Sequence, residues 1–146
     1  MAVHELGHVA ALRLLGVRLE GVTLAATGPV LRCGAVRPGL PGALAALSGP
    51  AAGTLLWLLL RRTWALAAEM SLVLALVNLL PVLPLDGGRA MEAVAYQRPG
   101  VLCAVRTLTL GALTLCGAWC LLAGWGWAPL LFAFWLITAP KLRSGL

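Results

Sequence analysis

The residues whose types and spacing most clearly indicate a catalytic site lie at the start of the chain, in the segment His4-Glu5-Leu6-Gly7-His8. These two histidines are the only ones among 146 residues. On a helix, positions i and i+4 lie one turn apart on the same face, so both imidazoles can bind one zinc ion. Glu5 projects about 100° further around the helix, from where its carboxylate can reach a metal-bound water. This H-E-x-x-H pattern is typical of a zinc peptidase.

One acidic residue has a setting that favours metal binding. Zinc in a catalytic site usually takes three protein ligands and leaves a fourth position for water, so the two histidines need one more ligand. The remaining carboxylates are Glu20, Glu69, Asp86 and Glu92. Asp86, the only aspartate, lies where Pro81 and Pro84 interrupt an apolar helix. Irregular backbone at membrane depth is tolerated where it lines a cavity, and an ionisable group there is a functional candidate.

Asp86 has an alternative role as the N-cap of a short helix that runs from Gly87 to about Tyr96. An H-E-x-x-H motif with an incomplete ligand set in the same chain favours metal ligation over capping. The sequence therefore predicts one zinc ion per chain, bound by His4, His8 and Asp86.

The composition indicates a membrane protein. The chain is 61% hydrophobic and 11% charged, with a mean hydropathy of +0.95, which is far beyond an ordinary soluble domain. A soluble H-E-x-x-H peptidase is therefore excluded. The net charge of +6 comes from basic residues that are scattered singly or in one pair, without a basic stripe. The sequence predicts contact with a lipid bilayer and no nucleic-acid partner.

Hydrophobic segments and helix breakers divide the chain into helices and one hairpin. A helix is predicted over residues 1–16 and a β-hairpin at the membrane edge over residues 17–38, with a turn at Thr27-Gly28-Pro29 and a second strand from Val30 to Val36. The predicted membrane helices cover residues 41–60, 64–80, 101–123 and 126–140. The predicted fold is an all-α polytopic membrane protein with about four to five transmembrane helices and a membrane-edge β-hairpin after the first helix.

The basic residues predict the orientation in the membrane. If the spans alternate in direction, Arg61 and Arg62 lie on one side and eight basic residues lie on the other. The eight are Arg13, Arg18, Arg32, Arg37, Arg89, Arg98, Lys141 and Arg143. The positive-inside rule places the larger group in the cytoplasm. The hairpin and the Pro81–Gly88 loop are therefore expected to face the cytoplasm from a bacterial cytoplasmic membrane.

The motifs, in this order, resemble those of the site-2 protease family of intramembrane zinc metalloproteases. H-E-L-G-H on a hydrophobic helix is followed about eighty residues later by N-x-x-P-x-x-P-L-D-G-G, from Asn78 to Gly88. The hairpin after the first motif and the Ser48-Gly49-Pro50 helix start are similar to the bacterial branch that includes the stage IV sporulation processing protease. The resemblance covers roughly residues 1–98.

The resemblance implies a role for each motif residue. His4 and His8 match the first two zinc ligands, Asp86 matches the third, and Glu5 matches the general base. Asn78 matches a helix-interior asparagine near the site, a candidate for positioning substrate or stabilising the oxyanion. The hairpin resembles a membrane-associated sheet that pairs with an unwound substrate segment.

This chain departs from the family in two places. The family often has an asparagine a few residues after its Gly-Pro, whereas this chain continues Pro50-Ala51-Ala52-Gly53. Family members also carry hydrophobic sequence before H-E-x-x-H, whereas Met1, Ala2 and Val3 precede the motif in this chain.

The expected function is that of an intramembrane zinc metalloendopeptidase acting on a membrane-embedded protein substrate, such as a transcription-factor precursor or its regulator, and working with a membrane regulatory partner. Residues 1–146 are expected to form a single integral-membrane peptidase domain. Its catalytic core covers residues 1–98, and two C-terminal membrane helices cover residues 99–146. The alternatives are a non-catalytic membrane homologue that binds substrates or partners, and a metal-handling membrane protein. The complete donor set together with Glu5 favours the peptidase.

Overall fold

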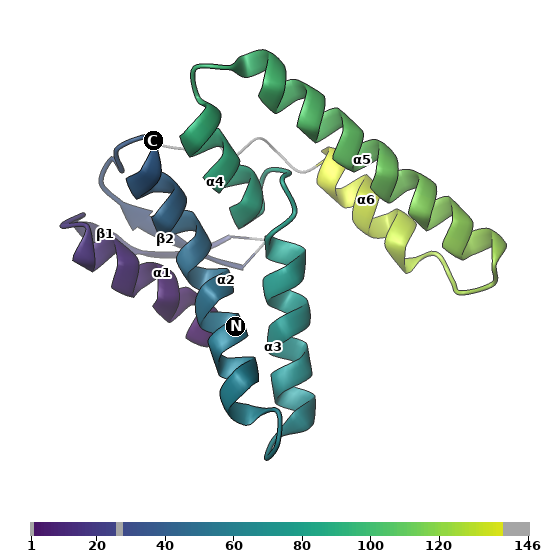
Figure 1. Ribbon diagram of the computed structural model, residues 1–146, viewed down its shortest axis with the longest axis horizontal. Coiled ribbons are helices and arrows are strands. Elements are labelled where there is room, and N and C mark those ends of the chain that lie inside the picture. The colour runs from purple at the N-terminus through teal and green to yellow at the C-terminus, as the bar shows by residue number, and fades with distance from the viewer. Residues whose placement is uncertain (1, 26–27, 139–146) are drawn as a thin grey trace.

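The computed structural model describes residues 2–25 and 28–138 of the chain. In order along the chain, the elements are α1 (Ala2–Leu14), β1 (Leu19–Ala25), β2 (Gly28–Cys33), α2 (Leu40–Leu60), α3 (Ala65–Asn78), α4 (Asp86–Ala95), α5 (Pro99–Leu122) and α6 (Ala128–Thr138). Figure 1 shows α1 to α4 gathered together, while α5 and α6 lie side by side and extend away from them. Both predicted metal-binding motifs fall in the first group, on α1 and α4.

Helix α2 is the centre of the first group, where it contacts α1, α3 and α4. The contact with α4 is a buried cluster of four alanines: Ala43, Ala46, Ala90 and Ala93. Towards α1, a Cβ atom added at Gly7 would lie 2.8 Å from the Cβ of Ala52. Towards α3, one added at Gly53 would lie 3.3 Å from the Cβ of Ala75. These small residues let the helix backbones approach closely, as is common between membrane helices.

Pro50 lies inside α2, in agreement with the helix predicted over residues 41–60, so the helix start at Ser48-Gly49-Pro50 that the family resemblance implied is wrong. The helix begins at Leu40, with Pro41 in its first turn, and runs through Pro50 to Leu60. Pro50 lacks the N–H group that would otherwise bond to the carbonyl of Ala46. Because Pro50 is fully buried and α1, α3 and α4 pack around this helix, tertiary contacts hold it together across the missing bond.

An antiparallel hairpin of β1 and β2 follows α1. Val22 pairs with Leu31 and Ala25 pairs with Gly28, with an irregularity near Leu19. The second strand ends at Cys33, so the expected strand from Val30 to Val36 is displaced towards the N-terminus. Val36 leaves the ladder because its side chain is buried in a cluster with Leu12 and Ala45. The expected turn at Thr27-Gly28-Pro29 is displaced as well, because Gly28 and Pro29 pair with Ala25 and Leu24 as the first residues of β2, while residues 26 and 27 lie outside the described part of the chain.

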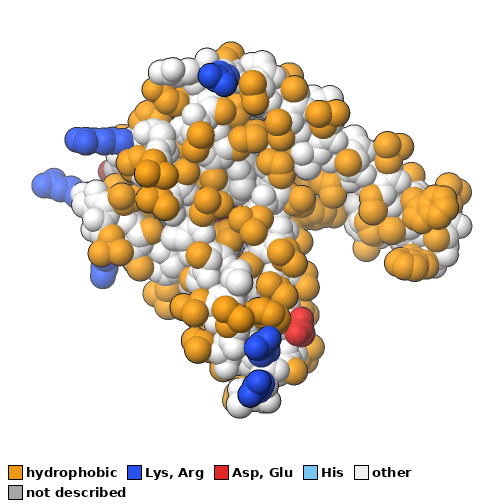
Figure 2. Space-filling view, in the orientation of Figure 1, with side chains coloured by type: hydrophobic (Ala, Val, Ile, Leu, Met, Phe, Trp, Pro, Cys, Tyr) orange, Lys and Arg blue, Asp and Glu red, His pale blue; other side chains and the backbone are white. Residues whose placement is uncertain are grey.

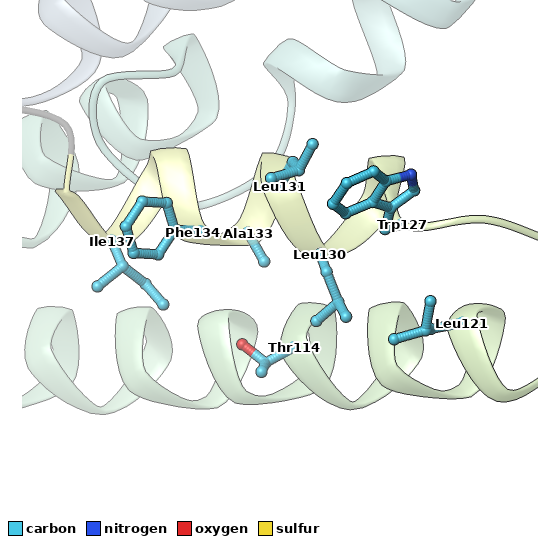
Figure 3. Close-up of a pocket in the computed structure, with 8 residues that line it drawn as sticks. All are labelled: Thr114, Leu121, Trp127, Leu130, Leu131, Ala133, Phe134 and Ile137. Carbon is cyan, nitrogen blue, oxygen red and sulfur yellow. The ribbon is translucent and has the colours of Figure 1, made fainter.

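Helices α5 and α6 form an antiparallel pair, and an apolar cluster packs α6 against the loop before α4. Val82 and Leu85 from the loop before α4 are buried together with Leu136 of α6. Between α5 and α6 lies a groove of about 360 Å³, shown in Figure 3. It is lined by Thr114, Leu121, Trp127, Leu130, Leu131, Ala133, Phe134 and Ile137. The lining is almost wholly apolar, as expected for a surface in contact with lipid.

Within the described residues, α2 and α5 are long and apolar enough to cross a membrane, as judged by length and composition alone. Helices α3 and α6 have 14 and 11 residues, so both are shorter than the expected spans over 64–80 and 126–140. At 1.5 Å per residue, α3 covers about 21 Å of a hydrocarbon layer of roughly 30 Å. Residues 139 and 140 of the expected last span lie outside the described part of the chain. The number of transmembrane helices therefore stays a prediction.

The protein surface is strongly apolar. Figure 2 shows hydrophobic side chains over most of the visible face, with basic side chains at its edges and at the tip where α2 turns into α3. On α5, Leu115 and Leu122 are 74% and 84% exposed. Such a surface is unfavourable in water and suits a lipid solvent.

Candidate metal centre

The structure brings His4, His8 and Asp86 together. The Nε2 atoms of His4 and His8 lie 3.0 Å and 3.3 Å from the same carboxylate oxygen, Oδ2 of Asp86. The two Nε2 atoms lie 3.3 Å from each other. One donor atom from each residue lies within 4.8 Å of the other two, so a single ion can contact all three.

Two helices supply these three ligands. Helix α1 presents both histidines from consecutive turns of the same face, with ring centroids 5.0 Å apart. Asp86 is the first residue of α4. A Cβ atom added at Gly87 would collide with the carbonyl of Leu79, and one added at Gly88 would lie 2.5 Å from the carbonyl carbon of Val82. The two glycines therefore let the first turn of α4 pack directly on the preceding loop, which fixes the position of the Asp86 carboxylate.

The alternative role of Asp86 as a helix cap is wrong. The N-cap of α4 is Leu85, and no side-chain hydrogen bond caps this helix. A capping carboxylate must accept N–H groups of its own helix, whereas Oδ2 of Asp86 lies against the two imidazoles. Among the described residues, neither Glu69 nor Glu92 belongs to the donor group. Glu69 instead accepts a hydrogen bond from Trp57 Nε1, at 3.2 Å.

Contacts behind the His8 ring orient it for metal binding. Its Nδ1 lies 2.8 Å from the backbone carbonyl of Ala45 on α2. A carbonyl can only accept, so Nδ1 carries the proton, and the lone pair of Nε2 is free for a metal. The Ser48 hydroxyl donates to the same carbonyl at 2.7 Å and lies 3.4 Å from Nδ1. Buried Nδ1 of His4 has no hydrogen-bond partner among the described residues.

Sequence reasoning missed the contribution of Ala45 and Ser48. Every residue carries a backbone carbonyl, so no residue-type signal marks Ala45 as the partner of a histidine 37 positions away. A serine in an apolar helix is also normally interpreted as a small packing residue, because Ser and Gly are common at helix interfaces. Only the approach of α1 to α2 reveals these contacts.

The burial and chemistry of the donor set fit zinc. His4 and Asp86 are 7% and 6% exposed. A buried carboxylate is costly unless it is paired with positive charge or hydrogen-bonded, and a metal ion meets that need. Two imidazole nitrogens and one carboxylate oxygen are ligands that Zn²⁺ prefers, and such a set leaves one position open for water or substrate. The site can therefore hold a catalytic rather than a purely structural ion.

The other two predicted site residues, Glu5 and Asn78, do not belong to the group of donor atoms in the described structure. Glu5 follows His4 on α1 and is half-buried. Asn78 is the last residue of α3, and its side-chain amide donates to the carbonyl of Leu74 at 2.9 Å. The Asn78 side chain therefore bonds to its own helix, and its role towards substrate stays a prediction.

A comparison with protein families decides the membership of the chain. The family described as "Peptidase family M50" matches residues 40–116, which is just over half of the chain and includes Asp86. The chain belongs to peptidase family M50. This is the family of the site-2 proteases, so the family-level resemblance read from the two motifs is confirmed. Family M50 consists of zinc metalloproteases, so membership implies zinc, and His4, His8 and Asp86 form a group that could hold the ion.

Two further comparisons agree with this membership. The chain is 36% identical over 118 residues to the "Putative zinc metalloprotease Rip3" of Mycobacterium tuberculosis, in strains Erdman and H37Rv. The match covers 68% of this chain and 30% of the relative, so the chain spans about a third of the length of these curated relatives. A solved structure, "Site-2 Protease from Methanocaldococcus jannaschii", matches with a TM-score of 0.67 at 19% identity, over 92% of this chain and 69% of that one. This likeness shows that the two share a fold.

Proposed function

We propose that this M50 protein is an intramembrane zinc metalloendopeptidase that cleaves a transmembrane or membrane-associated protein. The observation that carries the proposal is the meeting of His4, His8 and Asp86 in a buried position within a chain whose surface is apolar. A zinc site with an open position, placed among membrane helices, is suited to hydrolysis of peptide bonds that water reaches poorly.

The residues of the site have separable tasks. When bound, zinc polarises the scissile carbonyl and lowers the pKa of a water molecule to about 7. Glu5 is the general base, which accepts the proton of the attacking water and then delivers it to the leaving amine nitrogen. The Ala45 carbonyl holds His8 so that its Nε2 faces the ion. Asn78 is proposed to position the substrate or stabilise the oxyanion after its side chain turns away from Leu74.

The substrate must unwind before it can be cleaved, because the peptide groups of a membrane helix are hydrogen-bonded internally. We propose that the β1–β2 hairpin lies at the membrane edge and pairs with the unwound segment by strand addition. The proposed substrates are transcription-factor precursors or their regulators, as in the sporulation branch that the hairpin resembles, and a membrane regulatory partner would control access.

The proposed activity can be tested with a pair of single-span membrane substrates reconstituted with the purified chain in liposomes. One substrate carries a Gly-Pro pair in its transmembrane segment and the other carries a continuous leucine helix. We expect cleavage within the membrane segment, faster for the Gly-Pro substrate, lost after chelation and restored by zinc. A zinc-loaded chain that cuts neither substrate would instead favour the non-catalytic homologue.

The proposed orientation places the metal site towards the cytoplasm of a bacterial cytoplasmic membrane. In a cysteine-free background, Arg62→Cys reports on the α2–α3 turn and Gln97→Cys reports on the α4–α5 connection, and both positions are exposed. We expect a membrane-impermeant maleimide to label position 62 in intact cells and position 97 only after permeabilisation. The reason is that the positive-inside rule places Arg61 and Arg62 outside the cytoplasm and the larger group of basic residues inside it. The reverse pattern would contradict this orientation.

A further inference from the structure

Gly49 of α2 lies directly against the metal-binding atoms. A Cβ atom added at Gly49 would collide with Nε2 of His8 and would lie 2.8 Å from Nε2 of His4. The nearest neighbours of this added atom all belong to these two imidazoles. The same Nε2 atoms lie beside the carboxylate of Asp86, so they are the donor atoms of the zinc site. Gly49 therefore opens onto the atoms that bind the ion.

The other glycines in the described helices have different surroundings. At Gly7, Gly42, Gly53, Gly87, Gly88 and Gly117, an added Cβ would meet atoms of residues outside the donor set, most of them backbone atoms or alanine side chains. At Gly100 and Gly111 it would meet nothing within 4 Å. Glycines of the first kind allow close packing of chain segments. Gly49 alone among these glycines faces the imidazole rings.

Neither the backbone conformation nor helix stability requires glycine at position 49. Gly49 lies inside α2 and is not among the glycines with positive φ. Alanine is the best helix former and glycine one of the poorest, so the helix itself would be more stable with alanine there. The glycine is therefore explained by the space that it leaves beside His4 and His8.

We propose that Gly49 is a positioning residue of the metal centre, whose missing side chain keeps open the space that zinc and the two imidazoles occupy together. The proposal rests on the His4, His8 and Asp86 site of the proposed function. Bonds of about 2.0–2.1 Å between zinc and nitrogen fix both rings once the ion is bound. In the zinc-free protein, no metal bond fixes the rings, so they can move away from an added methyl group, although the His8 ring then gives up its contact with the Ala45 carbonyl. A methyl group at position 49 should therefore oppose metal binding much more strongly than folding.

The test compares Gly49→Ala with Gly53→Ala in the full chain purified in detergent. Gly53 lies one turn further along α2, where an added Cβ would lie 3.3 Å from Ala75, so it adds the same methyl group away from the metal. Zinc affinity is measured by chelator competition, and thermal stability is measured with and without zinc. We expect Gly49→Ala to bind zinc at least about 100-fold more weakly than wild type, which is the upper end of the loss seen when a residue that supports a metal ligand is removed. Gly53→Ala should retain near wild-type affinity.

The zinc-free measurements separate positioning from packing. We expect zinc-free Gly49→Ala to melt within about 5 °C of zinc-free wild type, because one hydrogen bond is at stake, and to gain almost no stability when zinc is added. Wild-type zinc affinity in Gly49→Ala would overturn the proposal, and so would a large loss of stability in its zinc-free form. Because no measurement depends on cleavage, a wild-type chain that binds zinc but cuts no substrate would refute the peptidase proposal while leaving this one intact.

Discussion

Replacing Glu5 with glutamine should abolish cleavage while leaving zinc bound. The substitution keeps the size of the side chain but removes the group that accepts the proton of water, and general acid–base catalysis contributes about 10²–10⁴-fold to rate. Glu5 is not one of the three residues whose donor atoms come together, so the zinc content should stay near one ion per chain. The measurement pairs zinc stoichiometry with the initial rate of cleavage of the Gly-Pro membrane substrate.

Glu69→Gln is the matched control for Glu5→Gln. Glu69 undergoes the same change from carboxylate to amide, but it is exposed on α3 and accepts a hydrogen bond from Trp57, which an amide oxygen can also accept. The cleavage rate of Glu69→Gln should therefore stay close to that of wild type. Substantial cleavage by zinc-loaded Glu5→Gln would remove Glu5 from its proposed role as general base.

Replacing Asp86 with alanine should remove zinc from the protein. Two imidazoles from one helix would remain, without the carboxylate that lies 3.0 Å from His4 and 3.3 Å from His8. Loss of a residue that hydrogen-bonds to a metal ligand costs about 10–100-fold in metal affinity, so loss of a direct ligand should cost at least about 100-fold. Zinc at about 100 times its Kd should stabilise wild type by about 2.7 kcal/mol and leave Asp86→Ala nearly unchanged. Chelator competition and thermal unfolding with and without zinc measure both effects.

Glu92→Ala on the same helix is the control for Asp86→Ala. It also removes a carboxylate from α4, but Glu92 does not belong to the donor group in the described structure. We expect wild-type zinc affinity in Glu92→Ala. If Asp86→Ala retained zinc and Glu92→Ala lost it, the third ligand would have to be reassigned.

The sequence by itself determined the parts of the site that follow from local periodicity. Helical spacing places His4 and His8 on one face and Glu5 about 100° further around the helix, and that geometry belongs to the helix backbone wherever the helix packs. The composition determined that the surface faces an apolar solvent, because so few charged residues cannot cover it. The ends of α2 and α5 also lay close to the predicted ones, since long apolar runs bounded by Pro, Gly or Arg give strong signals.

Other features required the tertiary structure. Asp86 had two compatible roles in the sequence, and only its distances to His4 and His8, 82 and 78 positions away, excluded capping. The family resemblance implied a helix start at Pro50, but contacts with the surrounding helices hold α2 together across this residue. Asn78 matched a family position, yet its amide bonds to Leu74 of its own helix.

The closeness of α1, α2 and α4 decided the remaining features of the metal centre. The Ala45 carbonyl reaches His8, and Gly49 leaves room beside both donor nitrogens, although neither residue type suggests such a role. The physical reason is that side-chain periodicity is a property of one helix, whereas the distance between helices depends on every small residue along their contacts. The sequence therefore determined which residues could bind zinc, and the packing of the helices determined which of them meet.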